Sequence, residues 1–177
     1  MGRKHILIFS LIVIFAIMQT SMFAHMLILN STPNLTLVFV CLLSYLRGND
    51  EGLYYGLVGG LTLDIVIGRS LGFYGLMYMG ICFLIGFFPR QNLRDNFFII
   101  MLIIIGAIFP FQLIIYWIKK ISIYFAMGMT EFTVETGVEI VRHTLPTTLY
   151  NCIVFIPVYF ISKKLDRFLD KDKKMMA

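Results

Sequence analysis

The sequence has little charge. Only 14% of its 177 residues are Asp, Glu, Lys or Arg, whereas 59% are hydrophobic. A soluble domain carries about 25% charged residues, so this composition excludes an ordinary soluble protein. The mean hydropathy of +0.84 agrees. We therefore expect an integral membrane protein, and the length predicts a single domain over residues 1–177.

Cysteine is also scarce, and its spacing suits no chemistry. Cys41, Cys82 and Cys152 all fall within apolar runs, and no Cys-x-x-Cys or Cys/His spacing occurs. We interpret them as buried thiols and predict no metal site and no cofactor. A nucleotide-binding loop and a Ser/His/Asp arrangement are missing as well. The sequence therefore predicts no catalytic residues and a protein that is not an enzyme.

Long apolar runs are abundant. A spanning helix needs about 20 apolar residues, and the candidate spans are residues 6–23, 34–46, 53–67, 71–88, 97–118 and 145–161. The sequence thus predicts an all-α, polytopic bundle of six transmembrane helices. The first run could also be a signal peptide, but the large Met22 does not suit a cleavage site after Ala24. We therefore interpret this run as a retained helix. The second and third runs are short, so either neighbouring helices shield them or they form a re-entrant hairpin.

The net charge of +5 is spread over the ends of the apolar runs and the basic tail 162–177. This distribution is typical of membrane topology and argues against nucleic acid as a partner. With the N-terminus inside, eleven of the 15 Lys and Arg residues lie on the inner side and four on the outer side. Both termini are therefore expected to be cytoplasmic, with the tail on anionic lipid.

The longest polar interval, residues 119–142, is expected to be a loop outside the membrane. Within residues 130–141, Glu131, Glu135 and Glu139 fall four residues apart, on one face of a helix. The pattern predicts an amphipathic helix at the outer membrane surface. Its acidic face is either solvated surface or a docking site for an extracytoplasmic partner. Three like-charged carboxylates without a nucleophile offer no acid/base asymmetry for catalysis.

The third run carries a strip in which every fourth residue is glycine or aspartate: Gly52, Gly56, Gly60, Asp64 and Gly68. On a helix these residues share one face. Glycine costs about 1 kcal/mol in a helix relative to alanine in water, but it lets another membrane helix approach closely. We predict packing against the fourth run, where Gly75 and Gly80 lie. An intermolecular face is the alternative.

Asp64 lies within the apolar run, where an unpaired carboxylate costs several kcal/mol. Its candidate partners are Arg69 and the free N–H groups at the start of the fourth helix, near Ser70 and Leu71. We favour these N–H groups with Arg69 assisting, so that Asp64 fixes the turn from Gly68 to Gly72. A proton or ion relay is the alternative, but no other acid and no histidine lies in the predicted spans.

The chain resembles the MreD family of rod shape-determining membrane proteins at Gly56-x-x-x-Gly60-Leu61-x-x-Asp64-Ile65-x-x-Gly68-x-x-Leu71-Gly72. Pro33 at the start of the second run, the charged turn 47–51 and the basic ends extend this resemblance over nearly the whole chain. One departure is Pro33-Asn34, where the family often has proline-aspartate. It argues against a charge-based role at this position.

The resemblance implies a non-enzymatic part of the cell-elongation machinery in the bacterial cytoplasmic (inner) membrane. Besides membrane lipid, it implies an MreC-like protein as a direct partner. An MreB-like filament and the RodA-type and class B penicillin-binding wall synthases would be direct or indirect partners. It also implies a fold similar to the substrate-binding subunits of energy-coupling-factor vitamin transporters.

Two other functions stay open from the sequence. A vitamin-transporter subunit would share the fold, but such subunits often dock through an Ala-x-x-x-Ala face on the first helix. Ala16 has no alanine or glycine four residues away on either side. A membrane enzyme could recruit polar residues at a membrane edge, although their spacing does not require it: Asp64, Arg69, Lys119, Lys120 and His143.

Overall fold

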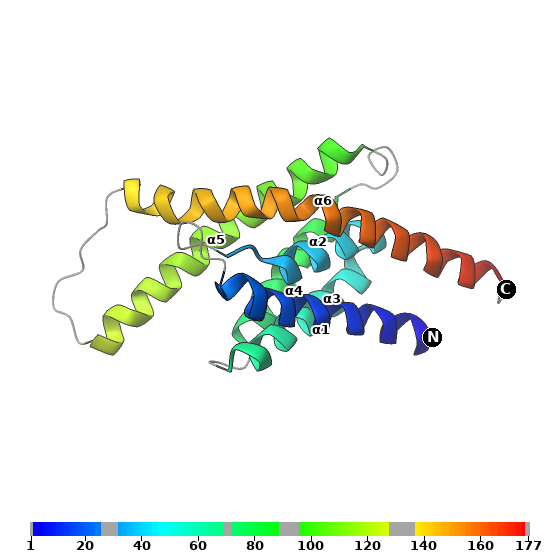
Figure 1. The fold of residues 1–177 in the computed structure, drawn as a ribbon, viewed down its shortest axis with the longest axis horizontal. Helices are drawn as coiled ribbons and strands as arrows, with labels where there is room; N and C mark the ends of the chain where they lie inside the picture. The colour runs from blue at the N-terminus through cyan, green and yellow to red at the C-terminus, as the bar shows by residue number, and fades with distance from the viewer. Residues whose placement is uncertain (1, 26–31, 69–71, 89–95, 128–136, 176–177) are drawn as a thin grey trace.

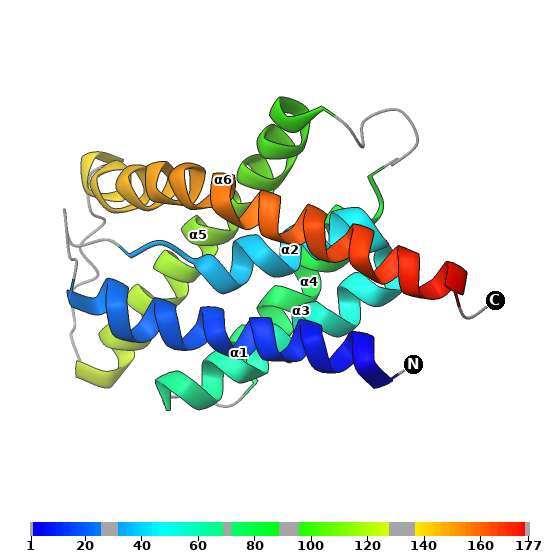
Figure 2. The same ribbon diagram turned by 45° about the vertical axis from the view of Figure 1, so that its right-hand side comes forward.

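The computed structural model describes residues 2–25, 32–68, 72–88, 96–127 and 137–175. This part of the chain forms six helices and no strand: α1 (Gly2–His25), α2 (Leu35–Arg47), α3 (Asn49–Ile67), α4 (Phe73–Gly86), α5 (Phe97–Met127) and α6 (Gly137–Met175). The all-α prediction is confirmed. Consecutive helices run in alternating directions, so the start of α1 and the end of α6 lie at the same end of the bundle (Figures 1 and 2).

Three helices contain segments long and apolar enough to cross a membrane by length and composition: Lys4–Ser21 of α1, Phe97–Ser122 of α5 and Thr144–Leu169 of α6. Much of their surface faces outward and is apolar, with Ile6, Leu102 and Ile153 each more than 60% exposed. Because water would leave such surfaces unfavourably hydrated, their natural surroundings are lipid or another apolar helix.

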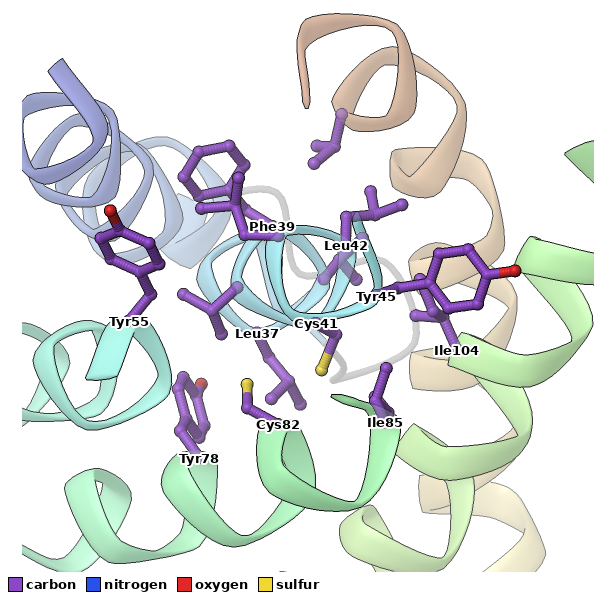
Figure 3. Packing of buried hydrophobic residues seen from close by; sticks show 14 of the residues in the cluster. Leu37, Phe39, Cys41, Leu42, Tyr45, Tyr55, Tyr78, Cys82, Ile85 and Ile104 are labelled. Carbon is purple, nitrogen blue, oxygen red and sulfur yellow. The ribbon is translucent and has the colours of Figure 1, made fainter. Parts of the chain in front are cut away.

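The short helix α2 is the centre of the bundle. It contacts each of the other five helices, and every residue from Leu35 to Leu46 is buried. In Figure 3, Cys41 points toward Cys82 of α4, and Tyr45 points toward Ile104 of α5. The 13 residues of α2 rise only about 20 Å. Neighbouring helices thus shield this short run from lipid.

Residues 119–142 differ from the expected outer loop. α5 continues through Lys119 and Lys120 to Met127, and α6 already begins at Gly137. Lysine is a good helix former and its apolar stem tolerates a membrane boundary, so this pair does not end the helix. The prediction of a separate amphipathic helix over 130–141 is wrong for residues 137–141, because these residues form the start of α6. Residues 128–136 lie outside the described residues.

The C-terminal part of α6 is helical as well, and one side of it is packed. Ser162, Asp166 and Leu169 are buried in the segment that was expected to be a basic tail. Lys164 and Arg167 are exposed on other sides of the same helix. Pro146, expected at the start of the last span, lies in the third turn of α6, because the helix begins at Gly137.

Candidate functional site

The hairpin of α3 and α4 is built on close backbone contact. A Cβ at Gly60 would lie 2.6 Å from the Cα of Gly75, and a Cβ at Gly56 would lie 2.8 Å from the carbonyl oxygen of Tyr78. Gly52 instead faces Ser44 of α2. The glycine strip therefore contacts two helices of its own chain. Gly80 points into open space, so its expected part in this contact is wrong.

Asp64 follows Gly60 by one helical turn and lies where α4 begins. Its Oδ2 accepts hydrogen bonds from the backbone N–H groups of Gly72 (2.9 Å) and Gly75 (3.1 Å), and its Oδ1 accepts one from Tyr74 (3.1 Å). The side chain is 2% exposed. The first N–H groups of a helix have no partner within the helix. Asp64 thus caps α4 from the preceding helix.

The turn between the two helices needs glycine at both of its described ends. Gly68 ends α3 with φ 68° and Gly72 precedes α4 with φ 94°. Residues with a Cβ rarely adopt such positive φ values. Asp64 bonds to the N–H groups at the start of the fourth helix, the partner that the sequence favoured. Arg69, Ser70 and Leu71 lie outside the described residues.

A second polar cluster, not found in the sequence, surrounds the start of α2. We call it the Asn34 cluster, and its members are Gln19, Asn34, Thr36, Tyr78 and Asn151. Asn34 Oδ1 accepts hydrogen bonds from Gln19 Nε2 (3.0 Å) and the Tyr78 hydroxyl (2.7 Å). The Asn34 N–H donates to Asn151 Oδ1 (2.8 Å), and the Thr36 N–H donates to Gln19 Oε1 (3.1 Å).

The Asn34 cluster joins α1, α2, α4 and α6 and satisfies free N–H groups at the start of α2. These hydrogen bonds also explain why asparagine can take the place of the aspartate that the family often has at this position. The Asn34 Oδ1 accepts two hydrogen bonds, as a carboxylate oxygen could, so the position works without charge. The Pro33-Asn34 step was the only signal in the sequence, because the partners come from other helices.

An ion-pair group lies at the other end of α2. Arg47 Nη2 is 3.1 Å from Asp166 Oδ1 of α6, and Arg47 Nη1 is 3.3 Å from Glu51 Oε2 of α3. The Arg47 and Asp166 side chains are 8% and 9% exposed, whereas Glu51 is 46% exposed. The sequence singled out the charged turn from Arg47 to Glu51, but nothing in it indicated Asp166 as a partner.

The described residues carry no arrangement suited to metal binding, since no three His, Cys, Asp or Glu residues gather among them. Cys41, Cys82 and Cys152 are free thiols, the first two buried and the third half-buried. Of the three glutamates proposed for partner binding, Glu131 and Glu135 lie outside the described residues. Glu139 lies in the first turn of α6, and its side chain is not described.

Buried polar groups that tie apolar helices to one another, with long apolar faces outside, define a multi-pass membrane protein. A model of one protein family, described as rod shape-determining protein MreD, matches residues 3–169. The chain belongs to the MreD family. No curated protein and no solved structure matches it, so a fold shared with vitamin-transporter subunits stays a prediction.

Membership of this family implies a role in rod shape determination. The family is a structural component of the shape-determining machinery and works with protein partners. The polar groups described above agree with a structural role, because Asp64, Asn34 and Arg47 each bond to another helix.

Proposed function

We propose that this chain is a non-enzymatic scaffold that bridges an MreC-like protein, an MreB-like filament and peptidoglycan synthases during lateral wall growth. The family match over residues 3–169 is the observation that supports it most. It favours this function over the vitamin-transporter alternative. The synthases in question are a RodA-type enzyme and a class B penicillin-binding protein.

The proposed setting is the bacterial cytoplasmic membrane, crossed by all six helices with both termini in the cytoplasm. The alternating helix directions in Figures 1 and 2 support an even number of crossings. The basic residues support the orientation, because Lys4, Arg47, Lys164 and Arg167 belong to segments at the end of the bundle where α1 starts and α6 ends. A re-entrant α2–α3 hairpin is the competing arrangement.

Asp64 and the glycine strip have a structural role in this proposal. Asp64, Gly68, Arg69 and Gly72 fix the α3–α4 turn, and the strip glycines set the distance between helices. Partner contact falls to other surfaces. Glu131, Glu135 and Glu139 are proposed as an acidic docking site for the extracytoplasmic part of the MreC-like protein.

Crosslinking in native membranes, followed by affinity purification and mass spectrometry, tests the scaffold. Recovery of an MreC-like protein together with wall synthases supports it. Recovery of an ATPase-linked transporter subunit in their place contradicts it and favours vitamin transport. The measurement needs no assumption about which surface is used.

The docking site is tested with a variant in which Glu131, Glu135 and Glu139 are all replaced by Gln. Recovery of the MreC-like protein should fall while the amount of folded scaffold stays normal. The matched control replaces the exposed Lys164 and Arg167 of α6 by Gln, at the opposite end of the bundle. Equal loss with both variants would contradict a specific acidic site.

A further inference from the structure

Two side-chain carboxamides inside the bundle, those of Gln112 on α5 and Asn151 on α6, have hydrogen-bonding capacity left over. Both residues belong to the long apolar segments of their helices, Phe97–Ser122 and Thr144–Leu169, and Asn151 is fully buried. The Gln112 Nε2 and the Asn151 Nδ2 are buried, and neither bonds to any residue that the structure describes. Lipid supplies no hydrogen-bond partner, and buried polar groups are nearly always bonded to protein or to ordered water. Both carboxamides therefore require a further partner.

Thr148 brings these two carboxamides close to each other. The Thr148 Oγ1 lies 3.2 Å from the Gln112 Oε1. Thr148 also precedes Asn151 by three residues in α6, and residues with this spacing lie on one face of a helix with their Cβ atoms about 5–6 Å apart. A water molecule that bonds to two groups spans about 6 Å, because each hydrogen bond is about 3 Å long. The spacing therefore suits a bridge of one water molecule.

The same two residues are also connected through the Asn34 cluster. The Asn151 Oδ1 accepts a hydrogen bond from the Asn34 N–H, and the Asn34 Oδ1 accepts one from the Tyr78 hydroxyl. The Tyr78 ring then packs against the ring of Phe111, the residue before Gln112, at a centroid distance of 5.9 Å. Together with Thr148, these contacts close a ring through α2, α4, α5 and α6. Every member of this ring has an uncharged side chain.

The Thr148 hydroxyl determines what kind of partner fits. Its oxygen lies 2.8 Å from the Thr144 carbonyl oxygen and 3.2 Å from the Gln112 Oε1, but a hydroxyl has only one proton to donate. When the proton goes to the closer acceptor, Thr144, the Gln112 carboxamide can turn over and donate to Thr148, and its Oε1 is then free in place of its Nε2. The Asn151 carboxamide is fixed, because its Oδ1 accepts from the Asn34 N–H. The partner must therefore accept from Asn151 and suit either end of Gln112.

We propose that one ordered water molecule binds between the Gln112 and Asn151 carboxamides and joins α5 to α6. Water both donates and accepts, so it suits either orientation of Gln112, whereas a carbonyl oxygen only accepts. An ion is disfavoured, because the uncharged ring offers it no counter-charge away from bulk water. Buried waters usually bond to two to four polar groups, and such bridges are nearly as good as direct hydrogen bonds.

Solid-state NMR of the full, isotope-labelled chain in lipid bilayers tests the proposal without any substitution. Magnetisation is transferred from water protons to the protein, and its arrival at each nitrogen is timed. The side-chain nitrogen of Asn151 should receive it well before the backbone nitrogen of Leu42, which is buried in the middle of α2. Arrival at Asn151 as late as at Leu42 would overturn the proposal, because no water would then lie beside the carboxamide.

A double-mutant cycle measures the bridge through its energy. Gln112→Met and Asn151→Leu each remove one partner of the water, and the cycle subtracts their separate bonds to Thr148 and Asn34. The unfolding equilibrium constant of the double variant should fall short of the additive value by about twofold or more. In the control, Gln112→Met and Ser162→Ala should be additive, since Ser162 lies eleven residues beyond Asn151, about 16 Å along α6. Additive losses in the first pair, or a Gln112→Met variant more stable than the wild type, would overturn the proposal.

Native mass spectrometry distinguishes water from a small solute with a hydroxyl group, which could form the same hydrogen bonds. The full chain is purified from native membranes, and its mass is measured under activation that removes water. Wild type and Gln112→Met should then differ only by the mass of the substitution. A bound compound of defined mass that is present in the wild type and lost in Gln112→Met would overturn the proposal and assign the site to that solute.

Discussion

Two buried aspartates stabilise opposite ends of the bundle by different means. Asp64 is bonded to backbone N–H groups that lie eight to eleven residues further along the chain. Asp166 is paired with the Arg47 side chain, which belongs to α2, far earlier in the sequence. The first carboxylate fixes a local turn, and the second joins distant parts of the sequence. Backbone N–H groups stabilise the Asp64 carboxylate through local contacts, whereas a side chain from a distant part of the sequence stabilises the Asp166 carboxylate.

The largest loss of stability is expected from a substitution at Gly60. This glycine lets α4 approach α3 closely enough for Asp64 to bond to its first N–H groups. A leucine at this position would collide with the backbone of Tyr74 and Gly75. Gly60→Leu should destabilise the protein by about 3 kcal/mol or more, since backbone cannot move aside as a side chain can. The fraction of monodisperse protein after detergent extraction measures this. Gly80→Leu, where a side chain meets open space, should extract normally.

Removal of the Asp64 carboxylate should have the next largest effect. Asp64→Ala leaves the Gly72, Tyr74 and Gly75 N–H groups without this acceptor, at a cost of about 3 kcal/mol in total. Asp64→Asn should cost less, because its amide oxygen can still accept. Protein levels and thermal midpoints in detergent report both. Normal levels of Asp64→Ala with loss of one partner would contradict the structural role.

The Arg47–Asp166 pair should be easier to replace. Asp166→Ala should cost about 1–3 kcal/mol, because Arg47 stays buried but keeps Glu51. Replacing both Arg47 and Asp166 by Leu should recover most of this loss, since well-packed apolar residues often substitute for a buried ion pair. Thermal midpoints of the two variants measure the difference. A double variant less stable than Asp166→Ala would refute this.

The smallest effect is expected at Glu51, the exposed partner of Arg47. Glu51→Gln should change stability by less than about 0.5 kcal/mol, as is usual for exposed pairs. The thermal midpoint should also depend little on salt concentration. A loss as large as that of Asp166→Ala would mean that Glu51, and not Asp166, is the main partner of Arg47.

The same contrast explains what the sequence could predict. The meeting of Asp64 with the start of α4 follows from residues within one hairpin, and the four-residue spacing of the glycines indicates a packed face. The helices follow from hydropathy. These are local features, so a single sequence contains the information needed to find them.

The Asn34 cluster and the Arg47–Asp166 pair could not be predicted in this way. Each depends on which faces of distant helices meet, and apolar periodicity does not specify that choice in a chain that is hydrophobic nearly throughout. The outer segment was misjudged for another reason. Polarity at Lys119 and Lys120 was taken as the end of a helix, although neither residue disfavours helical backbone.

The position of α2 has a consequence for biosynthesis. Asn34, the residue just before α2, is bonded to Asn151, and Arg47, its last residue, is paired with Asp166. Both partners belong to α6. A ribosome produces α2 well before α6, so α2 lacks these partners until α6 has been made. A nascent chain released before α6 would expose an unfinished short helix to lipid.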